Sequence, residues 1–163
     1  MINKKKPEEI EALGEAGHIL AKILKELARE AVAGATTLDI DDRAMELVEE
    51  YDVEPILLGY HPGFADRPYP AAVCVSVNNC VQHGIPSSDV VLHDGDVVNI
   101  DMSIAYQGMV VDSGLTVGVG EIDDEARRLL ACTQEALAHG IKAAQPGGHI
   151  GDISEAVQKF VES

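Results

Sequence analysis

Apolar residues recur every three or four positions early in the chain, which is the spacing of one face of an α-helix. A first stripe follows Pro7 and spans about 20 residues, with Gly34 as its stop. Its members are Ile10, Leu13, Gly17, Leu20, Ile23, Leu24, Leu27 and Ala31. Residues 36–39 have the composition of a helix start, and the stripe behind them predicts a second helix that ends near Tyr51.

The middle of the chain changes to patterns that are typical of strands. Residues 73–77 and 97–104 alternate or run apolar and predict two strands, and residues 109–119 predict a third. Only the segment 106–108 separates the last two strands, so we expect them to form a hairpin.

Helical spacing returns after the strands. One stripe begins at Asp123 and continues to about position 146, and a final helix begins at about Asp152 and is expected to run to the last residue. Helices, an antiparallel sheet and helices again, in this order, predict an α+β fold in which helices cover the sheet.

A loop, residues 55–70, lies between the second helix and the first strand and is broken by glycines and prolines. It contains Tyr60, Phe64 and Tyr69, which are half of the six aromatic residues of the chain. A solvated linker does not need such rings. They either pack the loop against its own body or line an apolar ligand pocket.

Composition narrows the class of protein. A chain of 163 residues that is 46% hydrophobic suits one globular domain. The 28 acidic and 12 basic residues give a net charge of −16, which disfavours nucleic-acid contact because phosphates would be repelled. No apolar run approaches the ~18–20 residues that span a bilayer. Acidic residues follow the basic start where a signal peptide would be apolar, so we expect a cytoplasmic protein.

The cysteines agree with that location. Cys74, Cys80 and Cys132 are odd in number and have no CxxC spacing. They lie in apolar patterns, so we expect reduced core residues and no disulfide framework or zinc site.

Asp101 and Asp112 are charged residues inside otherwise apolar strands. A buried carboxylate needs a cation, hydrogen bonds or the wet face of the sheet. A hairpin that turns about positions 106–107 would place the two directly opposite each other, with Cβ atoms roughly 4.5–5.5 Å apart. A one-residue shift of the turn would put them on opposite faces. Either hard divalent cations bind between them, as in two-metal hydrolytic sites, or they are separate solvent-facing residues.

His83 lies between the first strand and a turn at Pro86. A loop histidine is commonly a surface residue, but beside a two-aspartate metal site it would carry a proton or donate to a scissile carbonyl. The other histidines lack metal-ligand spacing and are expected on the surface or in the core; they are His18, His61, His93, His139 and His149.

Four segments are specific in combination: Gly59-Tyr60, residues 69–79, the His-Gly-Ile-Pro run 83–86 and residues 94–101. Their order is matched by their spacing, with 18 positions from His83 to Asp101 and 11 from Asp101 to Asp112. In this combination the chain resembles the type I methionine aminopeptidase family, and the similarity extends over its whole length.

The resemblance implies a pita-bread fold, in which two pseudo-symmetric α+β halves enclose a dinuclear metal site. It implies a hydrolase that removes the initiator methionine from nascent polypeptides with two divalent ions, which could be Co, Mn, Fe or Zn. It also implies that Asp101 chelates one metal, that Asp112 bridges both, and that His83 contacts the substrate and stabilises the tetrahedral intermediate.

The resemblance assigns the pocket for the methionine side chain to Leu57, Tyr60 and either Phe64 or Tyr69. The stretch 62–68 looks like an insertion relative to the shorter loop of many relatives, so the last position stays open between the two rings. An apolar, ring-lined pocket suits an unbranched thioether.

The family's other metal ligands, one His and two Glu, and a second substrate-contacting His have no matching motif in this sequence. Two carboxylates are too few for two ions that need about four to six ligands each. We therefore expect residues 1–163 to be the N-terminal portion of a catalytic domain, inactive without the C-terminal portion. The alternatives are a non-catalytic module of the same fold that binds peptides or proteins, and pairing of chains through the uncovered half-interface.

Overall fold

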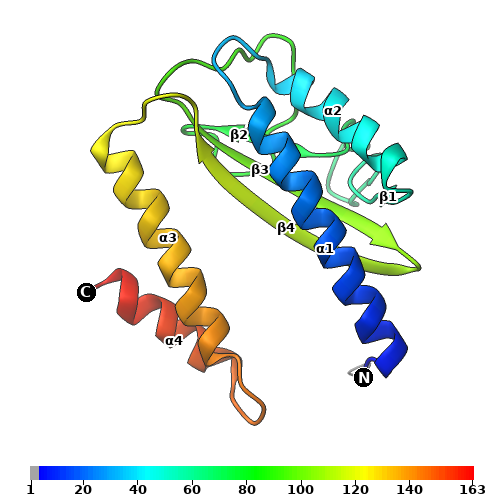
Figure 1. Cartoon of the computed structure of the whole chain (residues 1–163), viewed down its shortest axis with the longest axis vertical. Helices are drawn as coiled ribbons and strands as arrows, with labels where there is room; N and C mark the ends of the chain where they lie inside the picture. Colours follow the sequence, from blue (N-terminus) through cyan, green and yellow to red (C-terminus); the bar gives the residue numbers. More distant parts are fainter. Residues whose placement is uncertain (1–3) are drawn as a thin grey trace. The chain divides into compact units, whose positions relative to one another are not determined.

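The computed structural model describes residues 4–163. These residues form two compact units, one that ends at Glu121 and one that comprises Ile122–Ser163. The first unit contains two helices and an antiparallel sheet, and the second contains two helices (Figure 1). The predicted α+β class and order of elements are confirmed. Among the described residues, no helix is both long and apolar enough to cross a membrane.

Helices α1 (Pro7–Glu30) and α2 (Thr37–Glu50) begin where their sequences provide caps. The Lys6 amide donates to the Glu9 carboxylate at 2.7 Å, and proline at the first helical position lacks the N–H that would be left unpaired there. At α2, the Thr36 hydroxyl accepts from the Asp39 amide at 3.1 Å while the Asp39 carboxylate accepts from the Thr36 amide at 2.7 Å. This reciprocal box fixes the start of α2 at the predicted position.

The sheet is built around β3 (Val97–Tyr106), which pairs antiparallel with every other strand. Strand β4 (Met109–Gly118) lies along one edge of β3. The other edge is shared by β2 (Cys74–Val77), opposite the first half of β3, and β1 (Glu54–Pro55), opposite its last residues. Strand β1 was not predicted, because a two-residue strand that contains a proline has no periodicity to detect.

The turn between β3 and β4 lies one residue later than predicted. Tyr106 pairs with Met109, and Gln107 and Gly108 form the two-residue loop with φ angles of 48° and 75°. A loop with two positive φ angles matches the right-handed twist of the strands, and glycine adopts such angles without steric cost. The backbone requirement at Gly108 therefore decided the position of the turn.

The two faces of the sheet carry different residues. Val98, Ile100, Met102 and Ile104 of β3 are fully buried and share one core with apolar side chains of α1 and α2. Helix α1 contacts both β3 and β4, and it lies across the sheet in Figure 1. The alternate residues of β3 point to the opposite face, because successive side chains of a strand alternate.

The second unit is a helix pair, α3 (Asp124–Ala143) and α4 (Ile150–Val161). The Asp123 carboxylate caps α3 by accepting from the Ala126 amide at 2.7 Å, as its position predicted. Gly140 packs closely on α4, where a Cβ would lie 3.1 Å from Val157 Cγ2. Helix α4 begins two residues before the predicted start, because Asp152 accepts from the His149 amide as the third residue of a capping box.

The end of α4 and the cysteines differ in part from prediction. Helix α4 ends at Val161 instead of running to the last residue. All three cysteines are free thiols, and Cys74 is buried as expected. Cys80 is exposed in the loop after β2 and Cys132 is half-buried, so the prediction of core positions was wrong for Cys80.

Candidate active site

Asp101 and Asp112 share the face of the sheet opposite α1, but they are not directly opposite each other as predicted. In the observed register Asp101 faces Gly114, and Asp112 faces Ser103. The two carboxylates are therefore diagonal neighbours, whose Cα atoms lie about 7–8 Å apart in a regular antiparallel pair.

The expectation that a shifted turn would separate them was also wrong. Moving a two-residue turn by one position changes every pairing by two residues, and residues two apart in a strand share a face. Because Gly114 has no side chain, the position across from Asp101 holds no side-chain atoms. The geometry therefore keeps both carboxylates on one face with space between them.

The electrostatics of this face disfavour charge on Asp101. Partial burial raises the pKa of Asp101, and the negative charge of Asp112 raises it further, whereas His83 lowers it. Asp112 is exposed, and the Ser103 hydroxyl donates a hydrogen bond to its Oδ1. Two carboxylates that repel each other would both be stabilised by a divalent cation between them.

The residues present supply part of a metal site. Carboxylate oxygens suit hard or borderline divalent cations, so the chemistry of the pair fits such an ion. Among residues 4–163, however, no group of three or more His, Cys, Asp or Glu side chains could hold a metal. The pair supplies two of the roughly four to six ligands that each ion needs.

His83 lies in an exposed loop whose backbone runs beside β2. Its φ of 56° is in the left-handed region, which is uncommon for residues other than glycine. The next residue, Gly84, accepts a hydrogen bond from the Val75 amide at 2.9 Å. A Cβ at Gly84 would lie 2.2 Å from the Val75 carbonyl oxygen, so only glycine allows the loop to come this close to the strand.

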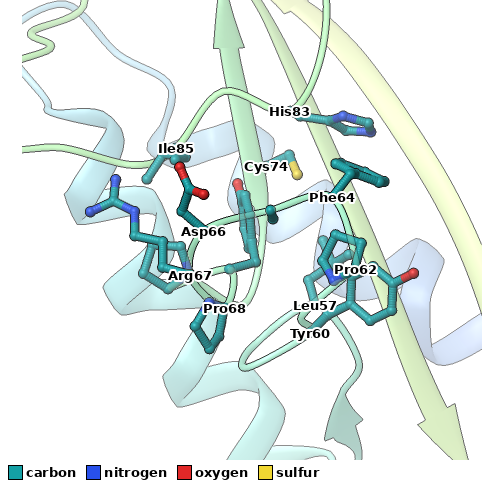
Figure 2. Close-up of a pocket in the computed structure, with 13 residues that line it drawn as sticks. Leu57, Tyr60, Pro62, Phe64, Asp66, Arg67, Pro68, Cys74, His83 and Ile85 are labelled. Carbon is teal, nitrogen blue, oxygen red and sulfur yellow. The ribbon is translucent and has the colours of Figure 1, made fainter.

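A cavity of about 450 Å³ opens beside this loop (Figure 2). Its walls come from the loop after β1, from β2 and from the His83 loop. The lining residues are Leu57, Tyr60, Pro62, Phe64, Ala65, Asp66, Arg67, Pro68, Tyr69, Pro70, Cys74, His83 and Ile85. The aromatic loop therefore lines a pocket, which was one of the two alternatives left open by the sequence.

Phe64 and Tyr69, the two candidates for one position in the predicted pocket, both line the cavity, but at different depths. The Phe64 side chain is 91% exposed, whereas Tyr69 is half-buried. Burial raises the pKa of the Tyr69 phenol, and the neighbouring Cys74 thiol raises it further. The loop is closed at its base because the Gly59 amide donates to the Tyr69 carbonyl and the Tyr69 amide to the Tyr60 carbonyl, each at 2.8 Å. Tyr69 thus belongs to the inner wall and Phe64 to the rim.

The structure brings His83 and all four predicted pocket residues around the cavity, but Asp101 and Asp112 are not among its lining. Cys74 connects the two places, because it lines the cavity and pairs directly with Asp101 in the sheet. Burial raises the pKa of the Cys74 thiol, although the nearby Tyr69 hydroxyl lowers it. No signal in the sequence distinguished Cys74 beyond its place in a predicted strand.

The remaining histidines have the ordinary surroundings that were expected. The His18 ring lies 2.7 Å from the Gly14 carbonyl oxygen, and the His61 ring lies 2.8 Å from that of Ala65. His139 stacks on Phe160, with ring centroids 4.6 Å apart. His93 and His149 lie near aspartates at 3.8 and 3.7 Å within their own turns.

Comparison with known proteins places this geometry in a family. The sequence profile of metallopeptidase family M24 matches residues 11–163. Methionine aminopeptidase of Aquifex aeolicus is 40% identical over 154 residues, which is 94% of this chain and 60% of that protein. Methionine aminopeptidase 1 of Bacillus subtilis is 37% identical over 163 residues, which is 100% of this chain and 63% of that protein. The chain thus spans about 60% of the length of these relatives.

Two solved structures superpose on nearly the whole of this chain. The methionine aminopeptidase of Thermotoga maritima superposes with a TM-score of 0.92 at 37% identity, covering 99% of this chain and 63% of that one. A prolidase from Pyrococcus furiosus superposes with a TM-score of 0.79 at 21% identity, covering 97% of this chain and 43% of that one, which shows a shared fold. The predicted pita-bread fold is confirmed, and this chain forms part of it.

Proposed function

Because the chain belongs to metallopeptidase family M24, we propose that its residues serve in the hydrolytic removal of the initiator methionine from nascent polypeptides. The observation that carries this proposal is the junction at Cys74. This residue lines the apolar cavity and is the direct neighbour of Asp101 across the β2–β3 pair. A side chain held in the cavity would therefore place the adjoining peptide bond near the carboxylate face.

The cavity suits methionine. Leu57, Tyr60 and Tyr69 provide apolar and aromatic walls, and Phe64 adds an outer rim. A thioether is flexible and polarizable and makes favourable contacts with ring edges. A nascent polypeptide presents such a residue at its amino terminus in the cytoplasm, where we place the protein.

The carboxylates would hold the metals. Asp101 would chelate one divalent ion and Asp112 would bridge two, with Ser103 orienting Asp112. Bound ions of this kind, Co, Mn, Fe or Zn, would polarise the scissile carbonyl and activate water at neutral pH. His83 would donate a hydrogen bond to the substrate and stabilise the tetrahedral intermediate.

We further propose that residues 1–163 correspond to the amino-terminal portion of the catalytic domain and do not turn over substrate alone. The incomplete ligand set supports this, since no group of three ligating side chains occurs among residues 4–163. The second unit supports it as well. Leu129, Leu137 and Ile141 of α3 are 59%, 63% and 64% exposed, so this helix carries an apolar stripe that its own unit does not bury. Such a stripe also permits pairing with another chain, which light scattering would detect.

The test is a chimera in which these residues replace the matching part of the Thermotoga maritima enzyme. Hydrolysis of a Met-Ala peptide is measured with the original sequence, with Asp112→Asn and with Asp89→Asn as a control of equal charge change. We expect activity in the first and third proteins and its loss in the second. Full activity of the Asp112→Asn chimera would overturn the assigned role of this carboxylate.

The incomplete ligand set also favours a second candidate function, a non-catalytic module that binds peptides or proteins. A module would bind Met-Ala peptides equally well in the presence and absence of divalent ions, and its chimera would lack activity. Metal-dependent turnover by the chimera would exclude it.

A further inference from the structure

We propose that Ser76 and Tyr69 are positioning residues that fix His83 beside the carboxylate face, acting through the backbone of Gly84. This inference rests on the substrate-contacting role proposed for His83. Neither hydroxyl would touch the substrate carbonyl in this arrangement. Their effect would be to hold the neighbouring residue in place.

The first observation is that both polar groups of Gly84 are held. Its amide donates to Ser76 Oγ at 3.0 Å. Its carbonyl accepts from the Tyr69 hydroxyl at 3.0 Å and from the Val75 amide at 2.9 Å. Together with the close approach to Val75, these bonds define the place of this residue against β2.

The second observation is that, within the described part of the chain, no hydrogen bond holds the His83 ring in place. The ring is exposed, and among the described residues the structure gives it no hydrogen-bond partner. Its backbone is held in the left-handed region, a conformation that persists only where the surroundings enforce it. The backbone therefore decides where the imidazole is attached and which region it can reach, and the bonds to Gly84 hold that backbone in place.

The third observation concerns Ser76 itself. It is 2% exposed in β2, between apolar neighbours, and its hydroxyl oxygen accepts a hydrogen bond from the Gly84 amide. A buried hydroxyl in a strand carries a desolvation cost, which this bond offsets. Tyr69 combines two roles, because its ring lines the cavity while its hydroxyl reaches Gly84. The variant Tyr69→Phe separates them, since it keeps the ring and removes the hydroxyl.

The first arm of the test is nuclear magnetic resonance on the 163-residue chain, which requires no turnover. In Ser76→Ala, we expect the Gly84 amide to exchange with solvent roughly tenfold faster, while core amides such as Ile100 keep their rates. We expect the His83 ring to become more mobile in both Ser76→Ala and Tyr69→Phe. The matched controls Ser113→Ala and Tyr106→Phe should change neither quantity. Unchanged Gly84 exchange and His83 mobility in the two variants would overturn the inference.

The second arm uses the chimera. We expect Ser76→Ala and Tyr69→Phe to lower kcat on the order of 10²-fold with little change in KM, because a misplaced group loses transition-state contacts. Ser76→Thr, which retains a hydroxyl, should recover most of the loss. A purely structural role would lower the Tm and leave the kcat of the folded enzyme unchanged, and that result would overturn the inference. If the unaltered chimera is inactive, the proposed function fails, and the resonance arm decides the inference separately.

Discussion

The two faces of strand β3 differ in what covers them and in what they carry. One face presents Val98, Ile100, Met102 and Ile104, all fully buried beneath α1 and α2. The other presents Asn99, Asp101 and Ser103, which neighbour Thr116 and Asp112 of β4. Alternate residues of one strand therefore belong to the core and to the candidate site.

This difference shows how the site obtains rigidity. Asp101 projects from β3, whose reverse face is fully packed, and Asp112 projects from the neighbouring strand β4. The packed reverse face of β3 supports the pair, although the carboxylates themselves do not contribute to that packing. The pair is unfavourable by itself, since burial and Asp112 both raise the pKa of Asp101. The covered face stabilises the fold, and the open face can therefore carry groups that repel each other.

The largest expected effect comes from comparing a substitution on the covered face of the sheet with one on the opposite face. Ile100→Ala should lower the free energy of unfolding by about 2–5 kcal/mol, because it leaves a cavity in the covered face. Val110→Ala truncates an apolar side chain that is 54% exposed on the opposite side and should cost under about 0.5 kcal/mol. Urea denaturation of both variants measures the difference. Equal losses would contradict the assignment of the faces.

A smaller effect is expected at the junction between the sheet and the His83 loop. Gly84→Ala places a Cβ 2.2 Å from the Val75 carbonyl oxygen, which both backbones must move to accommodate. We expect a loss of about 1–3 kcal/mol, as in other overpacked positions. Urea denaturation gives the total, and amide exchange locates it. Faster exchange should be confined to β2 and the loop, and equal acceleration at Ile100 would contradict this local origin.

Most of the fold was predictable because local signals decide it. Helix starts followed the capping residues Thr36 and Asp123, and the strands followed apolar alternation. The errors lie where local signals compete or are absent. Gly108 displaced the hairpin turn by one residue, and the two-residue strand β1 exists only through its pairing with β3.

Less of the site was predictable, since it depends on contacts between distant segments. The sequence identified Asp101, Asp112 and His83 as candidates, but it could not give their register or the support that they receive. The contact of Ser76 with Gly84 crosses eight positions, and that of Tyr69 crosses fifteen. Serine in a strand and tyrosine in a loop are ordinary residues until folding brings one to the amide and the other to the carbonyl of the same glycine.

Asp41 of α2 is buried among mostly apolar residues, and this carboxylate gives a pH-dependent prediction. Its Oδ1 accepts from the Ala72 amide at 2.8 Å and the Val73 amide at 3.3 Å, joining α2 to the start of β2. Burial nevertheless raises the pKa of Asp41 above its ordinary value of 3.8. The folded chain therefore holds this proton more tightly than the unfolded chain, so stability declines as pH rises from 3.8 through the raised pKa.

Asp41→Asn keeps the acceptor oxygen and removes the ionisation. The free energy of unfolding of Asp41→Asn, relative to that of the original chain, should increase by less than about 1 kcal/mol over that pH interval. Above the interval the difference should level off. Urea unfolding at several pH values measures this, with Asp89→Asn as the control. A constant difference between Asp41→Asn and the original chain at every pH would show that desolvation of Asp41 does not affect folding.

The smallest effect on folding is expected at the rim of the cavity. The loop that lines the cavity contains both an exposed rim residue, Phe64, and a half-buried wall residue, Leu57. Phe64 is 91% exposed, so Phe64→Ala should change the free energy of unfolding by under about 0.5 kcal/mol. A rim contact contributes little to affinity, and we expect a roughly two- to fivefold rise in KM for a Met-Ala peptide in the chimera. Leu57→Ala, which truncates a half-buried wall residue, should raise KM further. If Phe64→Ala proved the more harmful of the two, the loop would have to close over the bound methionine, and Phe64 would belong to the inner wall.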